Sequence, residues 1–204
     1  MRRPLLRSKV WHDWRHSQWL ILACALLFSL ECTAYSYSAK GKEVLLEGRT
    51  ALLTAMEQKN PAQVETAMSM LQPEIAYLEA HHGAKVSLAL STAVTRNDSV
   101  ATAQALDAAF AVEIARRLDA AEKEILNYQS AKVLVVKSKL FLDLLQPRLN
   151  PEQRKASDTA LRLCLSAIGN PGVFGVGKVA PDLSAFQQGK HQLLEQIQWL
   201  NPPE

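Results

Sequence analysis

The apolar positions of this chain recur most regularly between Ser99 and Gln146, a stretch without glycine or proline. In its first half they repeat at steps of three and four residues, a spacing that places side chains along one face of an amphipathic helix. This pattern predicts a helix that packs against neighbouring helices through that face. The residues of the stripe are Leu106, Phe110, Ile114, Leu118, Ala121, Ile125 and Tyr128.

The second half of the same stretch has a different pattern. Between Val133 and Leu145 apolar residues cover almost every face of a helix, so we expect this part to be the most enclosed element of the fold. A single helix over the whole stretch would be about 70 Å long at ~1.5 Å per residue. Two packed helices joined near residues 127–130 suit a compact domain better, because a single rod would leave its apolar half uncovered.

The residues before this stretch also have helical spacing. The pattern predicts two antiparallel helices here, one over residues 42–57 and one between Asn60-Pro61 and Gly83. The glycine is expected to end the second helix. Pro73 in the middle of the second helix predicts a kink or a short break. Residues 84–94 fit both an alternating strand and a helical face, and we expect a helix because their surroundings are helical.

Proline and glycine divide the carboxyl-terminal part of the chain. Asn150-Pro151 and Pro181-Asp182 each precede an apolar pattern of helical spacing, so each predicts the start of a helix. The chain is 48% hydrophobic but only 6% aromatic, which favours an Ala/Leu-rich helical domain over a β protein. The predicted fold is an all-α bundle of about five to seven helices, formed by a single domain over residues 35–204.

The charges are unevenly distributed. Residues 1–34 hold five basic and two acidic residues, and this difference of three equals the net charge of +3 of the whole chain. The remainder is neutral, with 18 basic and 18 acidic residues. Because binding to phosphates needs a concentrated basic surface, a neutral body argues against nucleic acid as the partner.

The amino-terminal segment has the order of an export signal. Basic residues precede an apolar run of about 12 residues, Trp19–Leu30, and small residues follow up to Ala34. The run is shorter than the ~20 residues that cross a bilayer comfortably, so we expect cleavage after Ala34. The alternative is an uncleaved membrane anchor, with Trp11, Trp14 and Trp19 at the interface. Either form places the body in the periplasm or on the outer face of the inner membrane of a bacterium, and only this segment would contact the membrane.

Four of the eight glycines lie between Gly169 and Gly177. The segment Gly172–Lys178 has the glycine and lysine spacing of a phosphate-binding loop, but Val179 replaces the hydroxyl residue and Pro181 delays the next helix. These features leave two interpretations, a structural connection between helices or an apolar tip that contacts a partner protein or a small ligand. The tip would consist of Val173, Phe174 and Val176.

Histidine and glutamate residues suggest a second kind of site. A Glu-x-x-His motif occurs once, at 79–82, and a second His–Glu pair lies one helical turn apart at 191 and 195. The alternative is structural, because His81 and His82 precede a glycine cap, where imidazole interacts well with the end of a helix. The candidate metal ligands are Glu79, His82, His191 and Glu195, with Glu113 as a further candidate.

The chemistry of an enzyme is not visible in this sequence. Cys164 lies on the apolar face of a predicted helix, which indicates a buried thiol, and no nucleophile motif or covalent haem motif occurs. We therefore expect a non-catalytic binding or interaction protein of the cell envelope that carries no cofactor. The alternative is a metal- or cofactor-binding bundle that uses His81, His82 and His191.

Overall fold

The structure is a computed structural model that describes residues 43–174 and 176–201. The chain divides into two units, Met1–Lys42 and Glu43–Glu204, and every described residue belongs to the second unit. The predicted export signal or anchor at residues 1–34 therefore lies outside the described residues. The domain boundary after Ala34 likewise stays a prediction.

Seven α-helices and two short 3-10 helices account for most of the described residues, with no β-strand among them. This confirms the predicted all-α bundle. The segment at 84–94, which fitted both a strand and a helix, forms most of α5. The elements are α3 (Val44–Glu57), α4 (Pro61–His82), α5 (Ser87–Thr95), α6 (Ser99–Lys123), α7 (Tyr128–Leu145), η1 (Gln146–Arg148), α8 (Pro151–Ala167), α9 (Leu183–Ile197) and η2 (Gln198–Leu200).

Short polar side chains determine where most of these helices begin. At the start of five helices an Asn or Asp side chain accepts a hydrogen bond from the backbone N–H three residues later, which satisfies a donor that has no partner inside the helix. Gly83 ends α4 with a φ of 67°, as predicted. The five capping residues are Asn60, Asp98, Asn127, Asn150 and Asp182.

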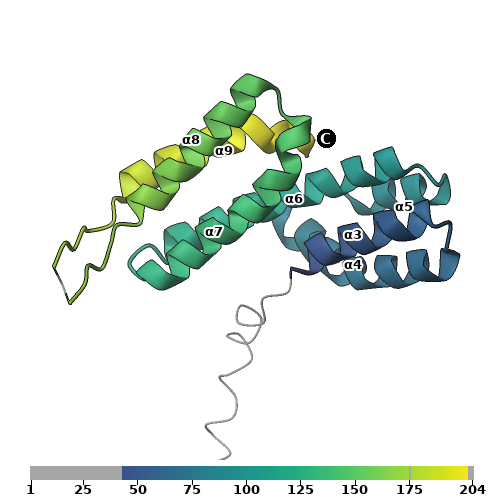
Figure 1. Cartoon of the computed structure of the whole chain (residues 1–204), viewed down its shortest axis with the longest axis horizontal. Helices are drawn as coiled ribbons and strands as arrows, with labels where there is room; N and C mark the ends of the chain where they lie inside the picture. Colours follow the sequence, from purple (N-terminus) through teal and green to yellow (C-terminus); the bar gives the residue numbers. More distant parts are fainter. Residues whose placement is uncertain (1–42, 175, 202–204) are drawn as a thin grey trace, which may run out of the picture. The chain divides into compact units, whose positions relative to one another are not determined.

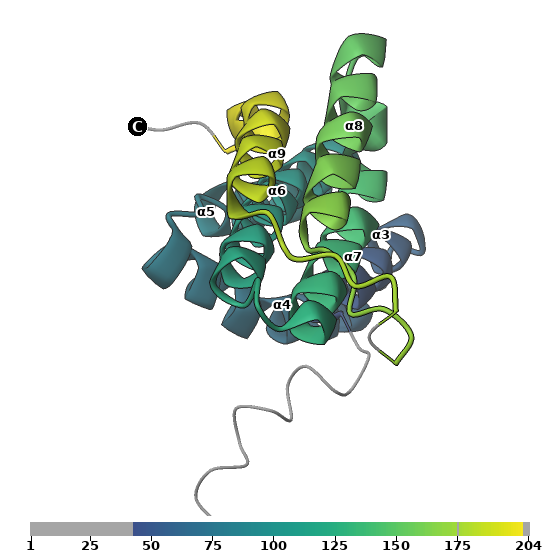
Figure 2. The same ribbon diagram turned by 90° about the vertical axis from the view of Figure 1, so that its left-hand side faces the viewer.

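Successive helices pack as pairs, with α3 against α4, α6 against α7, and α8 against α9 (Figure 1). Helix α6 is the element that connects these pairs, because it also contacts α3, α4, α5 and α9. Figure 2 shows α8 and α9 side by side when the molecule is turned by 90°. The central stretch is thus a helical hairpin, as predicted, and its two helices are joined by residues 124–127.

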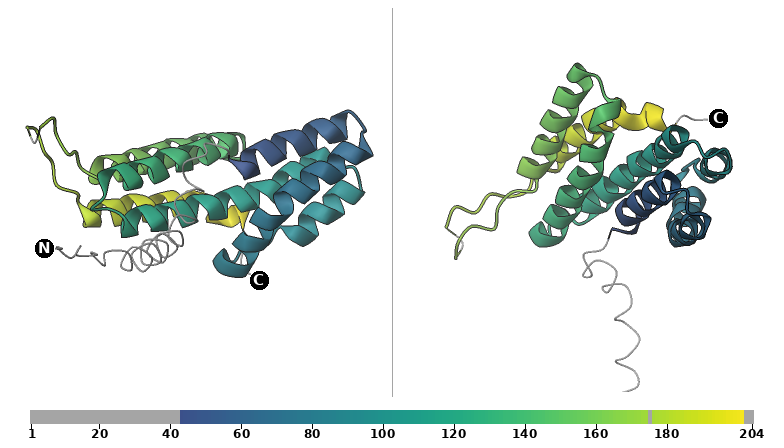
Figure 3. Two further views of the ribbon diagram at one scale, coloured as in Figure 1. Left: turned by 90° about the horizontal axis from the view of Figure 1, so that it is seen from below. Right: turned by 45° about the vertical axis from the view of Figure 1, so that its right-hand side comes forward.

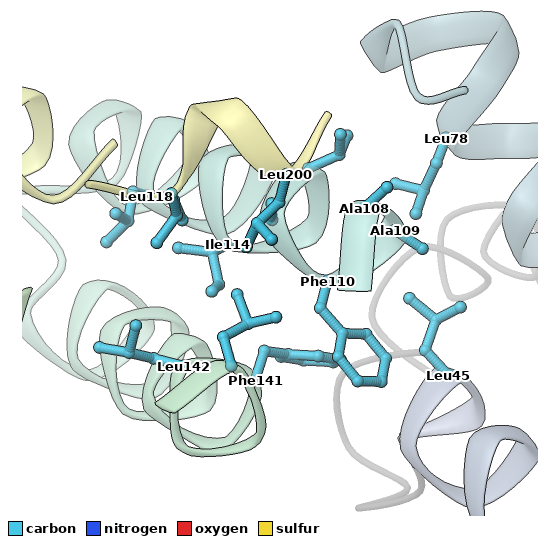
Figure 4. Close-up of a cluster of buried hydrophobic side chains, with 14 of the residues drawn as sticks. Leu45, Leu78, Ala108, Ala109, Phe110, Ile114, Leu118, Phe141, Leu142 and Leu200 are labelled. Atoms are coloured by element: carbon cyan, nitrogen blue, oxygen red, sulfur yellow. The ribbon is translucent and has the colours of Figure 1, made fainter. Parts of the chain in front are cut away.

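The core is centred on α6. The rings of Phe110 on α6 and Phe141 on α7 meet edge to face with their centroids 5.3 Å apart (Figure 4). Both side chains are buried, and so are Ile114 and Leu118 on the following turns of α6. Ala108 and Ala109 are also buried, and their small side chains leave room for the neighbouring helices to approach.

The prediction that residues 133–145 form the most enclosed element is wrong. Every residue of α6 from Ala105 to Ile114 is buried, whereas α7 exposes Val133, Val136 and Leu140 by 41–46%. The reason is the number of neighbours, because α7 packs mainly against α6 and α8 while α6 has helices on several sides. An apolar residue on every face of a helix therefore did not mean burial on every face.

Pro73 does not break α4, which is continuous from Pro61 to His82. A proline inside a helix removes one backbone N–H and leaves the carbonyl four residues earlier, that of Ser69, without its helical donor. Both residues are exposed, so that carbonyl can bond to water. The short break considered from the sequence is thus excluded.

Candidate functional site

The connection between α8 and α9 is a narrow loop of fifteen residues, 168–182. Asn170 and Val179 exchange two backbone hydrogen bonds of 2.9 and 2.8 Å, and Val173 and Val176 exchange two of 3.0 Å. The side chain of Asn170 also accepts a 2.9 Å hydrogen bond from the N–H of Gly172. These bonds hold the two arms of the loop together, and the loop extends beyond the ends of the helices (Figure 3).

The glycines of this loop have a structural explanation. Gly169 and Gly172 have φ values of 76° and 75°, in the left-handed region that favours glycine. A Cβ atom on either residue would also overlap a carbonyl oxygen of the opposite arm, that of Val179 or Val176 respectively. Because the loop follows helix α8 rather than a strand, the glycine spacing here reflects a tight two-armed loop and not the strand–loop–helix arrangement that binds phosphate.

The tip of the loop is apolar and uncovered. Val173, Phe174 and Val176 are exposed by 73%, 104% and 80%, the highest value being that of the aromatic ring. Phe174 has a φ of 51°, which is uncommon for a residue other than glycine. Lys178 is the single ionisable residue between Gly169 and Pro181. The structure thus brings the three residues of the predicted tip together at the surface and leaves the tip outside the core.

Glu79 has a structural partner on the next helix. Its Oε1 accepts hydrogen bonds of 2.9 and 2.7 Å from the N–H groups of Val86 and Ser87, and its Oε2 accepts one of 2.6 Å from the Ser87 hydroxyl. Desolvation alone would raise the pKa of Glu79, but these hydrogen bonds outweigh it and hold the pKa below 4.5. Glu79 therefore caps the start of α5 from the preceding helix.

His82, His191 and Glu195 lie in exposed positions, whereas Glu113 is buried. His82 Nε2 is 3.5 Å from the hydroxyl of Tyr77, and desolvation is the main reason why the pKa of His82 is lowered. His191 Nδ1 is 3.5 Å from Glu195 Oε1, with side chains exposed by 75% and 51%. Within the described residues, no three His, Cys, Asp or Glu side chains form a group that could hold a metal ion. The structure thus does not assemble the proposed ligands, and the metal site stays a hypothesis from the sequence.

Cys164 lies between α8 and α9. Its side chain is fully buried, and its thiol donates a 3.7 Å hydrogen bond to the carbonyl oxygen of Phe186. Burial raises the pKa of this thiol to about 12. Because the thiolate is the reactive form, the group is suited to packing rather than to nucleophilic or redox chemistry.

We predict that Cys164 resists alkylation in the native protein. Iodoacetamide at pH 8 should leave the Cys164 peptide unmodified over a time in which a denatured sample reacts completely, because both access and ionisation are suppressed. Peptide mass spectrometry measures the modified fraction, and the denatured sample is the control. Equal labelling of native and denatured protein would contradict the assignment of Cys164 to the core.

A buried ionic network, which was not predicted from the sequence, surrounds Glu113 on α6. Glu113 accepts hydrogen bonds of 2.6 Å from both Arg116 and Arg117, which follow it on α6 by three and four residues. Arg117 also pairs with Glu43, which is 3.0 Å from the ammonium group of Lys137. The network therefore joins the residue before α3 to α6 and α7.

The charges in this network stabilise one another. Desolvation alone would raise the pKa of Glu113, but the hydrogen bonds and positive charges of Arg116 and Arg117 hold it below 4.5. The guanidinium group of Arg117 also lies 4.8 Å from the centre of the Phe141 ring. The ion pairs of Glu113 with the two arginines could have been predicted from the sequence, since residues three and four apart are neighbours on a helix. We interpret the network as structural.

A second feature that the sequence did not reveal is a pocket of about 310 Å³ at the start of α6, lined by both charged and apolar side chains. Asp107 in its wall is 97% buried and lies 3.4 Å from Arg148 Nε through its Oδ2 atom. Burial raises the pKa of Asp107 above 3.8, although the charges of Arg49 and Arg148 oppose the shift. Among the described residues, Asp107 Oδ1, Arg49 Nε and Arg148 Nε have no hydrogen-bond partner. These charged side chains line the pocket together with the apolar side chains of Leu53, Val100 and Leu144.

Comparison with known proteins gives no match, whether to a protein-family model, to a curated protein or to a solved structure. In the part of the chain that the structure describes, none of the helices combines the length and apolar character that a membrane span requires. The case for a functional site therefore rests on the geometry of the molecule. Among the described residues, the loop tip brings together three highly exposed apolar side chains, those of Val173, Phe174 and Val176.

Proposed function

We propose that this protein is a non-catalytic binding protein of the bacterial cell envelope, and that it recognises a partner protein through the α8–α9 loop tip. The observation that carries the proposal is the tip itself, where Val173, Phe174 and Val176 are 73–104% exposed on a loop whose arms are held by four backbone hydrogen bonds. An exposed aromatic ring on an ordered support is typical of a binding anchor.

The loop is longer than its structural task requires. Helices α8 and α9 are packed neighbours, and such pairs are usually joined by about 2–8 residues. Here fifteen residues form the connection, and one of them, Phe174, adopts a left-handed backbone conformation that costs about 1–2 kcal/mol. Unfavourable conformations of this kind are concentrated at functional sites. These features favour a role in binding over a purely structural connection.

The cellular location in this proposal rests on the sequence. The order of basic, apolar and small residues before Tyr35 is that of an export signal, and an uncleaved anchor would place the body on the same side of the membrane. The partner is therefore expected in the periplasm or at the outer face of the inner membrane.

Site-specific photocrosslinking in intact cells tests this function. A photoreactive phenylalanine analogue at position 174 should give a discrete crosslinked product. The same analogue at Leu140, which is 46% exposed on α7, should not give that product. In envelope extracts, excess purified wild-type protein should suppress the product, whereas excess Phe174→Ser protein should not.

Two results would contradict the proposal. The first is that the photoreactive residue gives the same crosslinked product at positions 140 and 174, or that excess wild-type protein and excess Phe174→Ser protein both suppress the product. The second is a large loss of thermal stability in the Phe174→Ser variant, which would mean that the ring supports the fold. Because the ring is fully exposed, we expect the melting temperature to change little.

A further inference from the structure

Helices α4 and α5 form an apolar groove on the surface, with a volume of about 590 Å³. Ile75 and Leu90 are buried at 3% and 1% exposure, while Leu88 is 82% exposed. Met68 adds a flexible apolar side chain that can adjust to an occupant. Ser69, Gln72, Ser87 and Ser91 supply polar groups around these residues, and Glu65 is the one charged side chain among the described residues that line the groove.

The α8–α9 loop tip has the properties of an occupant for this groove. A cavity of about 150 Å³ is enough to hold a benzene molecule, so a groove of about 590 Å³ has room for the ring of Phe174 and the flanking valines. The tip is narrow, because its two arms are bonded to each other through Val173 and Val176. A narrow tip can enter a groove without unfolding of either partner.

The charges of the two surfaces are complementary. Residues 61–95, which contain α4 and α5, hold three acidic residues and one basic residue, a net charge of −2. In the part of the loop farther from the helices, residues 169–181, Lys178 is the one charged residue, and the Asp182 carboxylate at the base of the loop caps the start of α9. Glu65 in the groove and Lys178 near the tip carry opposite charges. These charges would come close together if the tip bound in the groove. Complementary charges of this kind favour the correct partner and orientation.

The two surfaces lie at different ends of the described unit. Figure 1 and the left view of Figure 3 both show the loop at one end and helices α4 and α5 at the other. A molecule therefore does not place its tip in its own groove. Contact between tip and groove has to join two copies, and the resulting pair would still present one unused groove on one copy and one unused tip on the other.

We propose that the groove formed by Met68, Ile75, Leu88 and Leu90 binds the α8–α9 loop tip of a second copy of this chain. The inference rests on the proposed function, because it identifies the partner of the same tip. The contact is head to tail, so the assembly grows into a ring or a linear chain unless one surface is blocked. Phe174 is the anchor, and the Lys178–Glu65 pair assists the orientation.

Sedimentation velocity on protein isolated from the envelope tests self-association with two variants. Phe174→Ser removes the anchor, and Leu88→Glu places a charge in the groove at an exposed position that the fold tolerates. Wild-type protein should form larger species as its concentration rises to several hundred micromolar. Each variant alone should associate about 30-fold more weakly, the effect expected for an anchor residue.

Mixing the two variants gives the sharpest test. Phe174→Ser protein keeps an intact groove and Leu88→Glu protein keeps an intact tip, so an equimolar mixture should form a 1:1 dimer and no larger species. Leu140→Glu, a charge introduced at an exposed position on α7, is the control and should associate like the wild type.

Some outcomes overturn the inference. The inference is wrong if the wild-type protein stays monomeric at every concentration up to several hundred micromolar. It is also wrong if the two variants associate as strongly as the wild type, or if their mixture forms no dimer. If the protein is monomeric while position 174 still crosslinks to a different protein, self-association is wrong and the proposed function stands. If position 174 also gives no specific product, both proposals are wrong.

Discussion

Replacing Phe141 with alanine is expected to lower the free energy of unfolding by about 3–5 kcal/mol. The side chain is 1% exposed, its ring packs edge to face against Phe110, and the guanidinium group of Arg117 lies over it. Removing the ring would lose its apolar burial and leave a cavity between α6 and α7, because a packed core relaxes only partly. Denaturation in urea measures the change in the free energy of unfolding. The dependence of this free energy on urea concentration should be compared between the variants, because a change in that slope would indicate an altered unfolded or native state.

Leu140→Ala is the matched control for this prediction. Leu140 precedes Phe141 on the same helix and is also apolar, but it is 46% exposed. Its replacement should cost less than about 1 kcal/mol, since little of its surface is removed from water on folding. Equal losses for the two variants would contradict the packing described for α7 and would restore the prediction that this helix is enclosed on every face.

The second large effect concerns the ionic network at Glu113. Glu113→Gln is expected to destabilise the protein by about 3–5 kcal/mol near neutral pH, because Arg116 and Arg117 would lose a shared and largely buried counter-ion. The control is Asp143→Asn, which removes an ion pair with Lys139 whose two side chains are 50% and 54% exposed. Screening by water makes such a pair contribute only about 0.3–0.5 kcal/mol.

The contribution of Glu113 depends on pH in a defined direction. Its pKa in the folded protein lies below 4.5, its ordinary value, so its stabilising effect is complete above that value and is lost as the pH falls through the folded pKa. The difference in unfolding free energy between the wild type and Glu113→Gln should therefore narrow when denaturation is measured at about pH 3 instead of pH 7. A difference that stays constant or widens in acid would contradict the prediction.

Most of the secondary structure follows from the sequence alone, because it depends on groups a few residues apart. A short polar side chain at Asn150 or Asp182 satisfies donors of its own helix, and Gly83 permits the left-handed conformation at the end of α4. The spacing of apolar residues identified the buried face of α6 for the same reason. The glycine-rich composition of residues 169–177 likewise predicted an irregular loop, and the structure shows Phe174 at its exposed tip.

Only the tertiary structure decided which apolar and charged residues have partners from distant parts of the chain. Val136 has the same apolar character as its buried neighbour Val135, but it is 46% exposed because none of the described helices covers that side of α7. Glu79, proposed from its spacing as a metal ligand, instead caps the start of α5, and Arg117 pairs with Glu43, 74 positions away. The groove between α4 and α5 is lined by residues of two helices, and no local pattern in the sequence specifies how those helices meet. Burial, ion pairing and surface shape depend on which elements meet, which short-range periodicity does not specify.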